Sequence, residues 1–270
     1  MIAACVKWVA GTPEPGDDRF AGISLADQAA LEMALRQGEA MDQPVVVFTV
    51  GPLAAERAVR DALACGAHRG VRIHIDADEV RHVDSARVAA LLAAELDSAT
   101  SVWCGDYSLD RGTGSVPAFL AAFLRAGQAL GVVEVSDLGE WLHVTRRLDG
   151  GRREVLRLES PAVVSVEGSV ARLRRAGLAA LMQTRTVAVE VRAADHLDQH
   201  QPPMVHPYRP RARALAAPHG DSPLERLREL TEATAAPTRG ETVHLDPHAA
   251  AARIVATLTE WGYVDAKESG

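Results

Sequence analysis

The chain has 270 residues, of which 47% are hydrophobic, and a formal net charge of -7 at pH 7. This length allows one sizeable core with an appended segment but is marginal for two full domains. Because basic and acidic residues are interspersed and the net charge is negative, the sequence lacks the electrostatic footprint of proteins that bind nucleic acid or anionic membranes.

The N-terminal residues predict a first strand and no signal peptide. The apolar run in MIAACVKWVAGT is too short and has no cleavage-site pattern, and no stretch approaches the ~20 consecutive apolar residues of a membrane span. The cysteines, Cys5, Cys65 and Cys104, lie far apart without a CxxC motif and are expected to be reduced and buried. We therefore expect a soluble, cytoplasmic protein.

Up to Val133, short β-branched runs alternate with longer Ala- and Leu-rich segments of helical period. This alternation is typical of βαβ units around a parallel sheet. The predicted strands are residues 2–6, 44–50, 71–75 and 101–104, and the predicted helices are residues 24–37, 53–65, 83–96 and 116–130. Gly38 and Gly66 are expected just past helix ends. The predicted fold class is α/β, a doubly wound, mostly parallel sheet of the Rossmann-like, adenine nucleotide hydrolase-like kind.

The middle of the chain has a different pattern. Residues 141–147 and 154–158 alternate polar and apolar side chains on either side of Asp149, Gly150 and Gly151, which are the residue types that hairpin turns favour. We predict an added β-hairpin there, followed by an apolar strand at residues 161–166. Residues 172–185 are basic and leucine-bearing without clear periodicity, and are predicted to be a surface loop.

The C-terminal part begins with a predicted linker and continues with helices. Residues 196–218 are rich in Pro, His and Arg and are not expected to form a core. Two helix starts follow, each with a capping residue and a proline at the first helical position. They are Ser222 with Pro223 and Glu225, and Asp246 with Pro247.

The final predicted helix, residues 247–261, carries an apolar stripe that some apolar surface must cover, and the linker allows it to reach a second chain. The stripe consists of Ala251, Ile254, Val255, Leu258 and Trp261. We thus predict two parts: a nucleotide-binding α/β domain over residues 1–190, and a linker with a helical arm over residues 191–270 that docks on a partner subunit.

The segment after the fourth predicted strand is the candidate ligand site. In open α/β sheets ligands settle at the carboxyl ends of strands, and free amides at a helix N-terminus favour phosphate. Gly112, Thr113 and Gly114 are therefore predicted to cradle a phosphate, with Arg111 adding positive charge. An ordinary glycine-rich turn explains the same residues equally well, because RGTG is neither a Walker loop nor a GxGxxG motif.

Other polar clusters are interpreted as surface or linker. Asp17 and Asp18 form an acidic pair, and a second acidic cluster consists of Asp76, Asp78 and Glu79. Three histidines at wider spacing are His196, His200 and His206. The acidic residues fit solvated loops, and the histidines lack the cysteine or carboxylate framework of a metal site. No GxSxG or HExxH motif is present. We predict no catalytic residue and no metal ligand.

Several collinear blocks resemble electron transfer flavoprotein beta subunits. Residues 45–73, VVVFTVGPLAAERAVRDALACGAHRGVRI, are similar to the family block VxxVSxGPxxxxxxLRxALAMGADRGIxV. CVKWV at residues 5–9 resembles the family's opening VAVKxV, and LADQAALEMALRQGE at residues 25–39 its first helix. LDGGRREVLRLESPAVVSV at residues 148–166 is similar to its hairpin and strand. The resemblance spans residues 1–190, with a weaker similarity in the last helix.

The resemblance implies an electron carrier subunit more than an enzyme with its own catalytic residues. Family members pair with a larger alpha subunit, share FAD with it, and in many cases bury AMP in the beta subunit, while electrons pass from a donor dehydrogenase to an acceptor. Nucleotide contacts, mostly through the backbone, would carry over to Cys5, Ile23, Ser24, Leu25, Ala26, Val50, Gly105, Asp110, Arg111, Gly112 and Thr113, with Gly114 next in the loop.

The resemblance also implies a partner recognition loop at residues 174–185. Leu178 occupies the position of the leucine that anchors partner dehydrogenases. The residues assigned to partner recognition are Arg174, Arg175, Leu178 and Met182.

Departures from the family pattern indicate a divergent member. The loop from Gly105 is shorter, RGTG replaces the usual NQTG, and Arg147 replaces a common glutamate. Thr12 and Leu25 stand where some members have aromatic residues facing the flavin. The nucleotide site could therefore hold either AMP or a second FAD. Two other functions also remain open: a flavin-less nucleotide-binding regulatory or scaffold subunit, and a stand-alone nucleotide-binding enzyme of the same fold.

Overall fold

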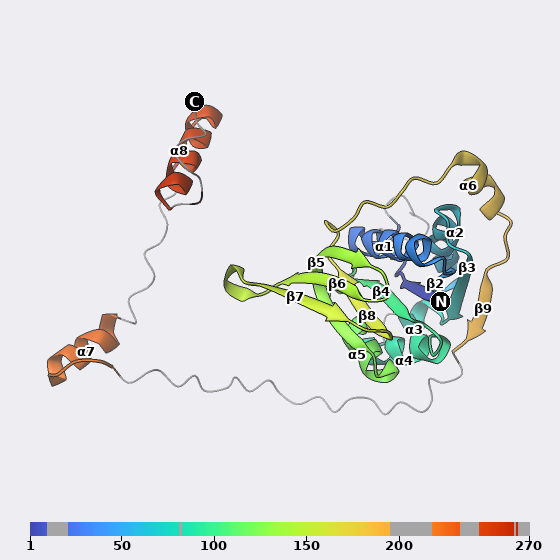
Figure 1. The fold of residues 1–270 in the computed structure, drawn as a ribbon, viewed down its shortest axis with the longest axis horizontal. Helices are drawn as coiled ribbons and strands as arrows, with labels where there is room; N and C mark the ends of the chain where they lie inside the picture. Colours follow the sequence, from blue (N-terminus) through green and yellow to red (C-terminus); the bar gives the residue numbers. More distant parts are fainter. Residues whose placement is uncertain (10–20, 81–82, 195–217, 233–242, 262, 264–270) are drawn as a thin grey trace. The chain divides into compact units, whose positions relative to one another are not determined.

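The computed structural model describes residues 1–9, 21–80, 83–194, 218–232, 243–261 and 263 (Figure 1). The chain divides into two units, residues 1–203 and residues 204–270, which are described separately. Thr12 lies outside the described residues, and so does the predicted linker at residues 196–218 except for its last residue. The predicted domain boundaries therefore stay a prediction.

The first unit is built on a nine-stranded sheet with the order β7-β6-β5-β8-β4-β1-β2-β3-β9. Its strands are β1 (Ile2–Cys5), β2 (Val45–Gly51), β3 (Arg69–His74), β4 (Ser101–Gly105), β5 (Gly127–Leu138), β6 (Leu142–Arg147), β7 (Arg153–Leu158), β8 (Ala162–Val166) and β9 (Glu190–Ala193). The pairs β5–β6 and β6–β7 are antiparallel and the others are parallel. The predicted α/β fold with a mostly parallel sheet is confirmed.

Helices cover both faces of this sheet. They are α1 (Leu25–Met41), the 3₁₀ turn η1 (Leu53–Ala55), α2 (Glu56–Ala64), α3 (Ala77–Val80), α4 (Ser85–Glu95), α5 (Val116–Leu124) and α6 (Leu178–Thr184). Figure 1 shows α1 and α2 over one face and α3, α4 and α5 over the other. Alternate strand residues supply the two cores: Val45 and Val47 pack with α1, whereas Val46 and Phe48 pack with α4. Burial on both faces explains the continuous apolar run of β2.

The C-terminal ends of α1 and α5 differ from the prediction. Helix α1 runs past Gly38 to Met41, and Asp42, its C-cap, has a left-handed φ of 51°. A Cβ on Gly38 would lie 2.5 Å from Cγ2 of Val45, so glycine permits close packing of the helix on β2. Helix α5 ends at Leu124, and Arg125, its C-cap, also has φ 51°. Residues 127–130 belong to β5, where pairing with β8 overrides the Ala- and Leu-rich composition.

Other predicted elements are confirmed or subdivided. The hairpin is confirmed as β6 and β7, joined by the 3₁₀ turn η2 (Asp149–Gly151), in which Gly150 has φ 72°. The predicted helix over residues 83–96 begins at Ser85, because Asp84 caps it by accepting from the amide of Arg87 at 2.7 Å. The predicted surface loop at residues 172–185 contains the short helix α6, and β9 was not predicted.

The second unit contains α7 (Pro223–Glu232) and α8 (Pro247–Glu260). Both predicted helix starts are confirmed. Ser222 and Glu225 exchange side-chain-to-amide hydrogen bonds of 3.0 and 3.2 Å, and Asp246 accepts from the amides of His248 and Ala249. Among the described helices, none combines the length and apolar character that crossing a membrane requires.

Candidate functional site

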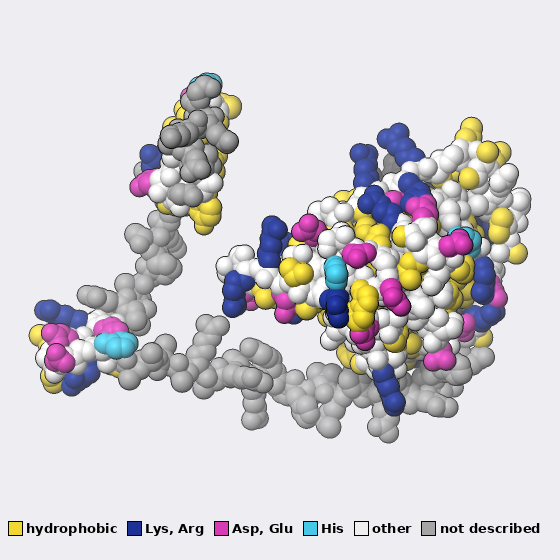
Figure 2. Space-filling view, viewed as in Figure 1, with side chains coloured by type: hydrophobic (Ala, Val, Ile, Leu, Met, Phe, Trp, Pro, Cys, Tyr) yellow, Lys and Arg dark blue, Asp and Glu magenta, His cyan; other side chains and the backbone are white. Residues whose placement is uncertain are grey.

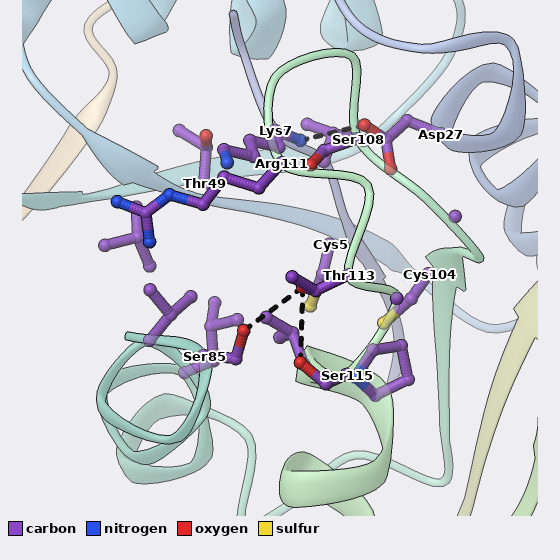
Figure 3. Close-up of a pocket in the computed structure, with 18 of the residues that line it drawn as sticks. Cys5, Lys7, Asp27, Thr49, Ser85, Cys104, Ser108, Arg111, Thr113 and Ser115 are labelled. Carbon is purple, nitrogen blue, oxygen red and sulfur yellow. Dashed lines mark hydrogen bonds between the residues drawn. The ribbon is translucent and has the colours of Figure 1, made fainter. Parts of the chain in front are cut away.

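A cleft opens at the carboxyl ends of β1, β2 and β4 (Figure 3). Its volume, counted to the open mouth, is about 890 Å³. The central strand β1 pairs with β2 on one side and with β4 on the other. Strands β2 and β3 thus extend the sheet in one direction from β1, and β4 extends it in the other. Such a switch point is where open α/β sheets bind ligands.

The base of the cleft is apolar and uncharged. Cys5 and Cys104 are directly opposite each other on β1 and β4, and both are buried. Figure 3 shows their sulfur atoms below Thr113. The hydrogen bond between the two thiols, together with burial, raises the pKa of Cys104 well above its usual value. Since Val50 and Val88 add apolar walls, the base suits an uncharged ring.

One buried polar atom in the cleft lacks a partner. The side-chain hydroxyl of Thr49, a residue only 1% exposed, lines the cleft and has no hydrogen-bond partner among the described residues. An unpaired buried hydroxyl carries a free-energy cost of about 1–3 kcal/mol unless another group or water satisfies it. A polar ligand atom in the cleft would satisfy it.

Hydroxyl groups and helix N-termini meet at one wall. The hydroxyl of Thr113 lies 3.4 Å from that of Ser85 and 3.2 Å from that of Ser115, the residues that begin α4 and precede α5. Gly114 has φ 58°, and a Cβ there would lie 2.3 Å from the carbonyl oxygen of Asp106. Only glycine therefore fits this turn. Amides and hydroxyls at helix N-termini favour an anionic group such as phosphate.

A buried carboxyl organises the opposite wall. Asp27 accepts a hydrogen bond from the backbone amide of Lys7 at 3.2 Å and another from the amide of Gly105. Burial raises the pKa of Asp27 to about 7, although these hydrogen bonds and those from Ser24 act in the other direction. Sequence reasoning missed Asp27, yet its position three residues after the helix-capping Ser24 was a signal, because its amide donates to Ser24 at 2.9 Å.

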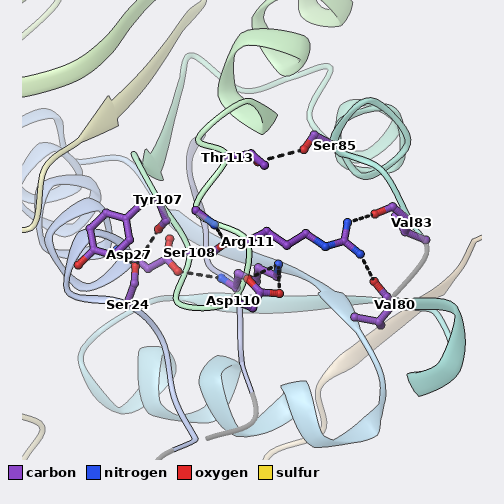
Figure 4. Close-up of polar contacts among 12 residues, drawn as sticks. Ser24, Asp27, Val80, Val83, Ser85, Tyr107, Ser108, Asp110, Arg111 and Thr113 are labelled. Atoms are coloured by element: carbon purple, nitrogen blue, oxygen red, sulfur yellow. Dashed lines mark hydrogen bonds and ion pairs between the residues drawn. The ribbon is translucent and has the colours of Figure 1, made fainter. Parts of the chain in front are cut away.

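The loop of residues 106–114 is tied down on two sides (Figure 4). Lys7 Nζ lies 2.6 and 2.8 Å from the carboxylate oxygens of Asp110. Partial burial acts in the opposite direction, but hydrogen bonds from Lys7, Ser108 and the Arg111 amide lower the pKa of Asp110 to about 2. On the other side, the guanidinium of Arg111 donates to the carbonyls of Val80 and Val83.

The cleft brings together part of the predicted nucleotide set. Cys5, Val50, Gly105, Arg111, Thr113 and Gly114 line it. The remaining predicted residues, Ile23, Ser24, Leu25, Ala26, Asp110 and Gly112, are not among its lining residues. The hydroxyl of Ser24 caps α1 and donates to the carbonyl of Tyr107 at 3.2 Å, while Leu25 is 62% exposed. The predicted roles of these residues in ligand contact stay predictions.

Sequence reasoning missed several polar side chains of the cleft. They are Lys7, Asp27, Thr49, Ser85, Tyr107, Ser108 and Ser115. Lys7 and Thr49 stand at the ends of β1 and β2, so the strand-end rule that selected the loop after β4 also pointed to them. Ser85 gave no such signal, because it begins α4 instead of following a strand, and only the tertiary fold brings it to the cleft.

The residues assigned to partner recognition have different surroundings. Leu178 and Met182 on α6 are 77% and 57% exposed, and Arg175 is exposed. Arg174 instead forms ion pairs with Glu32 and Glu39 on α1. Arg147, at the position of the family's glutamate, pairs with Glu167 at 2.7 Å.

Residues 18–197 match the family described as the electron transfer flavoprotein domain, which covers well over half of the chain. The chain belongs to this family. It is 31% identical over 173 residues to electron transfer flavoprotein subunit beta of Bos taurus, covering 63% of this chain and 68% of that protein. The subunit beta of Bradyrhizobium diazoefficiens is 31% identical over 162 residues, covering 59% and 63% of the two chains.

A further relative is Protein FixA of Rhizobium meliloti, 31% identical over 182 residues, with 64% of this chain and 62% of that protein covered. The relatives from Bos taurus and Bradyrhizobium diazoefficiens are both beta subunits, so the chain is a divergent beta-type member of the electron transfer flavoprotein family. The predicted family is thus confirmed.

Proposed function

We propose that this chain is the beta subunit of a heterodimeric electron transfer flavoprotein, with a larger alpha subunit as its partner. In this proposal FAD lies at the subunit interface and relays electrons from a donor dehydrogenase to an acceptor. The chain itself contributes binding surfaces and no catalytic side chain, and it works in the cytoplasm. Its membership of the family, on the beta side, supports the role.

We further propose that the cleft holds an adenine nucleotide, with AMP as the first candidate. The observation that carries this step is the unpaired hydroxyl of Thr49 in a cleft that is apolar at one end and polar at the other. The thiol-lined base fits an adenine ring. The hydroxyls of Ser85, Thr113 and Ser115, at the N-termini of α4 and α5, fit a phosphate.

FAD supplies the redox chemistry when it is bound, and the partner subunit is proposed to hold most of it. On this chain we propose that Leu25, which is exposed at the start of α1, contacts the flavin. A hydrophobic side chain in this position would exclude water from one side of the ring. The alternative of a second FAD in place of AMP is decided by the experiment below.

Co-expression with an alpha subunit of the same family tests the function. The expected product is a yellow heterodimer that releases FAD and AMP, identified by mass spectrometry after denaturation. Two FAD molecules per heterodimer would replace AMP in the proposal. A colourless heterodimer that binds only nucleotide would favour the regulatory subunit, and nucleotide turnover by the isolated chain would favour the stand-alone enzyme.

A matched pair of glycine variants tests the nucleotide site. Gly114→Val adds a side chain at a positive φ and within 2.3 Å of a carbonyl oxygen, so the purified complex should lose its AMP. The control is Gly177→Ala, where an added Cβ meets no atom within 4 Å. Nucleotide that survives Gly114→Val at the wild-type ratio would place the site elsewhere.

A further inference from the structure

The recognition loop, residues 174–185, presents an apolar helix that cannot be ordered by its own contacts. Leu178, Leu181 and Met182 of α6 are 77%, 38% and 57% exposed, and no residue of the helix is buried. Figure 2 shows hydrophobic side chains standing out where Figure 1 places α6. The helix has seven residues and no side-chain cap at its start. A helix this short is unstable alone, so other groups must hold it.

Arg60 on α2 holds the C-terminal end of α6. One nitrogen of its guanidinium donates to the carbonyls of Thr184 and Arg185, at 3.1 and 3.3 Å, and to that of Val187. Thr184 is the last residue of α6. The helix dipole is negative at this end, so a cation is favourable there. Another nitrogen of Arg60 donates to Glu56 at 3.0 Å, which fixes the side chain in this direction.

Arg174 holds the other end of the loop on α1. Its backbone amide and its Nε both donate to one carboxylate oxygen of Glu32 at 3.0 Å, and its guanidinium also reaches Glu39. The side chain of Glu32 is only 5% exposed. Although burial raises the pKa of Glu32, the hydrogen bonds from Arg174 and Arg36 lower it below its usual value. The loop is thus fixed to a buried charge on the first helix.

We propose that Arg60 and Arg174 are positioning residues for partner recognition. They fix both ends of the recognition loop on α2 and α1, so that the apolar face of α6 is already ordered before a donor dehydrogenase with an apolar recess docks on it. A loop ordered in advance loses less conformational entropy on binding. This inference rests on the proposed electron carrier function, and it assigns Arg174 an anchoring role instead of direct contact with the partner.

The test uses the full heterodimer with FAD bound. The variants are Arg60→Ala and Arg174→Ala, each compared with its lysine replacement, which keeps the charge but not the fork of donors. Arg69→Ala is the control, because it removes an ion pair with Glu190 at 2.6 Å that joins β3 and β9 and lies outside residues 178–187. Leu178→Ala removes the predicted anchor without touching either arginine.

The first readout is amide hydrogen exchange over residues 178–187. Both alanine variants should increase exchange there by about tenfold, the change expected from losing one or two charge-assisted hydrogen bonds, with lysine variants intermediate. Arg69→Ala and Leu178→Ala should leave this exchange unchanged. Unchanged exchange in both Arg60→Ala and Arg174→Ala would overturn the inference. Thermal unfolding of each variant checks that the rest of the fold is intact.

The second readout is electron transfer from a donor dehydrogenase of the same organism, chosen beforehand because it reduces the wild-type flavin. The alanine variants should raise the KM for this donor by about tenfold with little change in kcat, and reduction by dithionite should be unchanged. Faster exchange with an unchanged KM would also overturn the inference. A wild-type complex without flavin, or without a donor, would instead contradict the proposed function.

Discussion

The charge of the Asp27 carboxyl depends strongly on the fold. It is 5% exposed, and its pKa is raised from 3.8 to about 7 by burial at the edge of the cleft. In the unfolded chain the group ionises near 3.8, so the folded state binds the proton more tightly between these values. The stability that this proton confers is therefore complete below about pH 3.8 and is lost as the pH rises through about 7.

Replacement of Asp27 by asparagine should remove this pH dependence. We compare the free energy of unfolding of the wild type with that of Asp27→Asn. The difference, wild type minus variant, should fall by a few kcal/mol between about pH 4 and pH 7, at about 1.4 kcal/mol per pH unit. Urea unfolding at several pH values in this window measures it. The control is Asp97→Asn, an exposed carboxyl at the start of a loop. Parallel curves for wild type and Asp27→Asn would contradict the assignment.

The sequence could predict single residues only where the cause is local. Ser222 and Asp246 were recognisable because a capping side chain acts within three residues of itself. The pKa of Asp27 depends on the amides of Lys7 and Gly105, which lie far away in the sequence. For the same reason Arg174 was assigned to partner contact, although its own partners are Glu32 and Glu39.

Helix α1 is joined to β4 by a buried amide side chain. Gln37 Oε1 accepts hydrogen bonds from the hydroxyl of Ser101 at 2.6 Å and from Trp103 Nε1 at 2.8 Å. All these side chains are nearly inaccessible to solvent, and Trp103 is fully buried. A single acceptor thus satisfies two buried donors on the neighbouring strand, and it fixes the position of α1 along β4.

Gln37→Leu should destabilise the first unit strongly. Leucine fills much of the same space but leaves the donors of Ser101 and Trp103 unpaired, at roughly 1–3 kcal/mol for each. We expect a loss of roughly 2–6 kcal/mol in urea unfolding. The control is Gln43→Leu, because Gln43 Oε1 accepts from the hydroxyl of Thr100 at 3.2 Å in a more exposed place. This change should cost about 1 kcal/mol. Equal losses would contradict this account.

At the level of elements, the strands with two covered faces were predictable and the boundary between α5 and β5 was not. The run from Val45 to Phe48 is apolar on both faces, which leaves little choice of structure. Residues 127–130 contain alanine and leucine and match either a helix or a strand. Their pairing with β8 decides the outcome, and that pairing depends on a strand more than 30 residues later.

The second unit presents an apolar surface on α8. Ile254, Val255 and Trp261 are 60%, 46% and 67% exposed, although they belong to the stripe that the sequence predicted to be covered. Exposed apolar groups of this size on one helix face are typical of a surface that meets another protein. The alpha subunit of the proposed heterodimer is the partner that fits this expectation.

The double change of Ile254→Ser and Trp261→Ser should weaken association with the alpha subunit by tenfold or more, since each removes an exposed apolar side chain. Sedimentation velocity over a concentration series measures the dissociation constant. The thermal unfolding of the isolated chain should stay the same. Ala256→Ser, on the opposite face of α8, is the control; if it weakens association as much as the double change, the stripe is not the contact.

Residues 106–114 are held at two sides, so the proposed nucleotide would raise the free energy of unfolding of the chain. The loop is held by Lys7 at the end of β1 and by the carbonyls of Val80 and Val83 beside α4, and the cleft lies between these supports. A ligand there would touch segments that come apart on unfolding, so only the folded chain would bind it. By mass action, the melting temperature would then rise with nucleotide concentration, and the nucleotide retained through purification would set the stability measured.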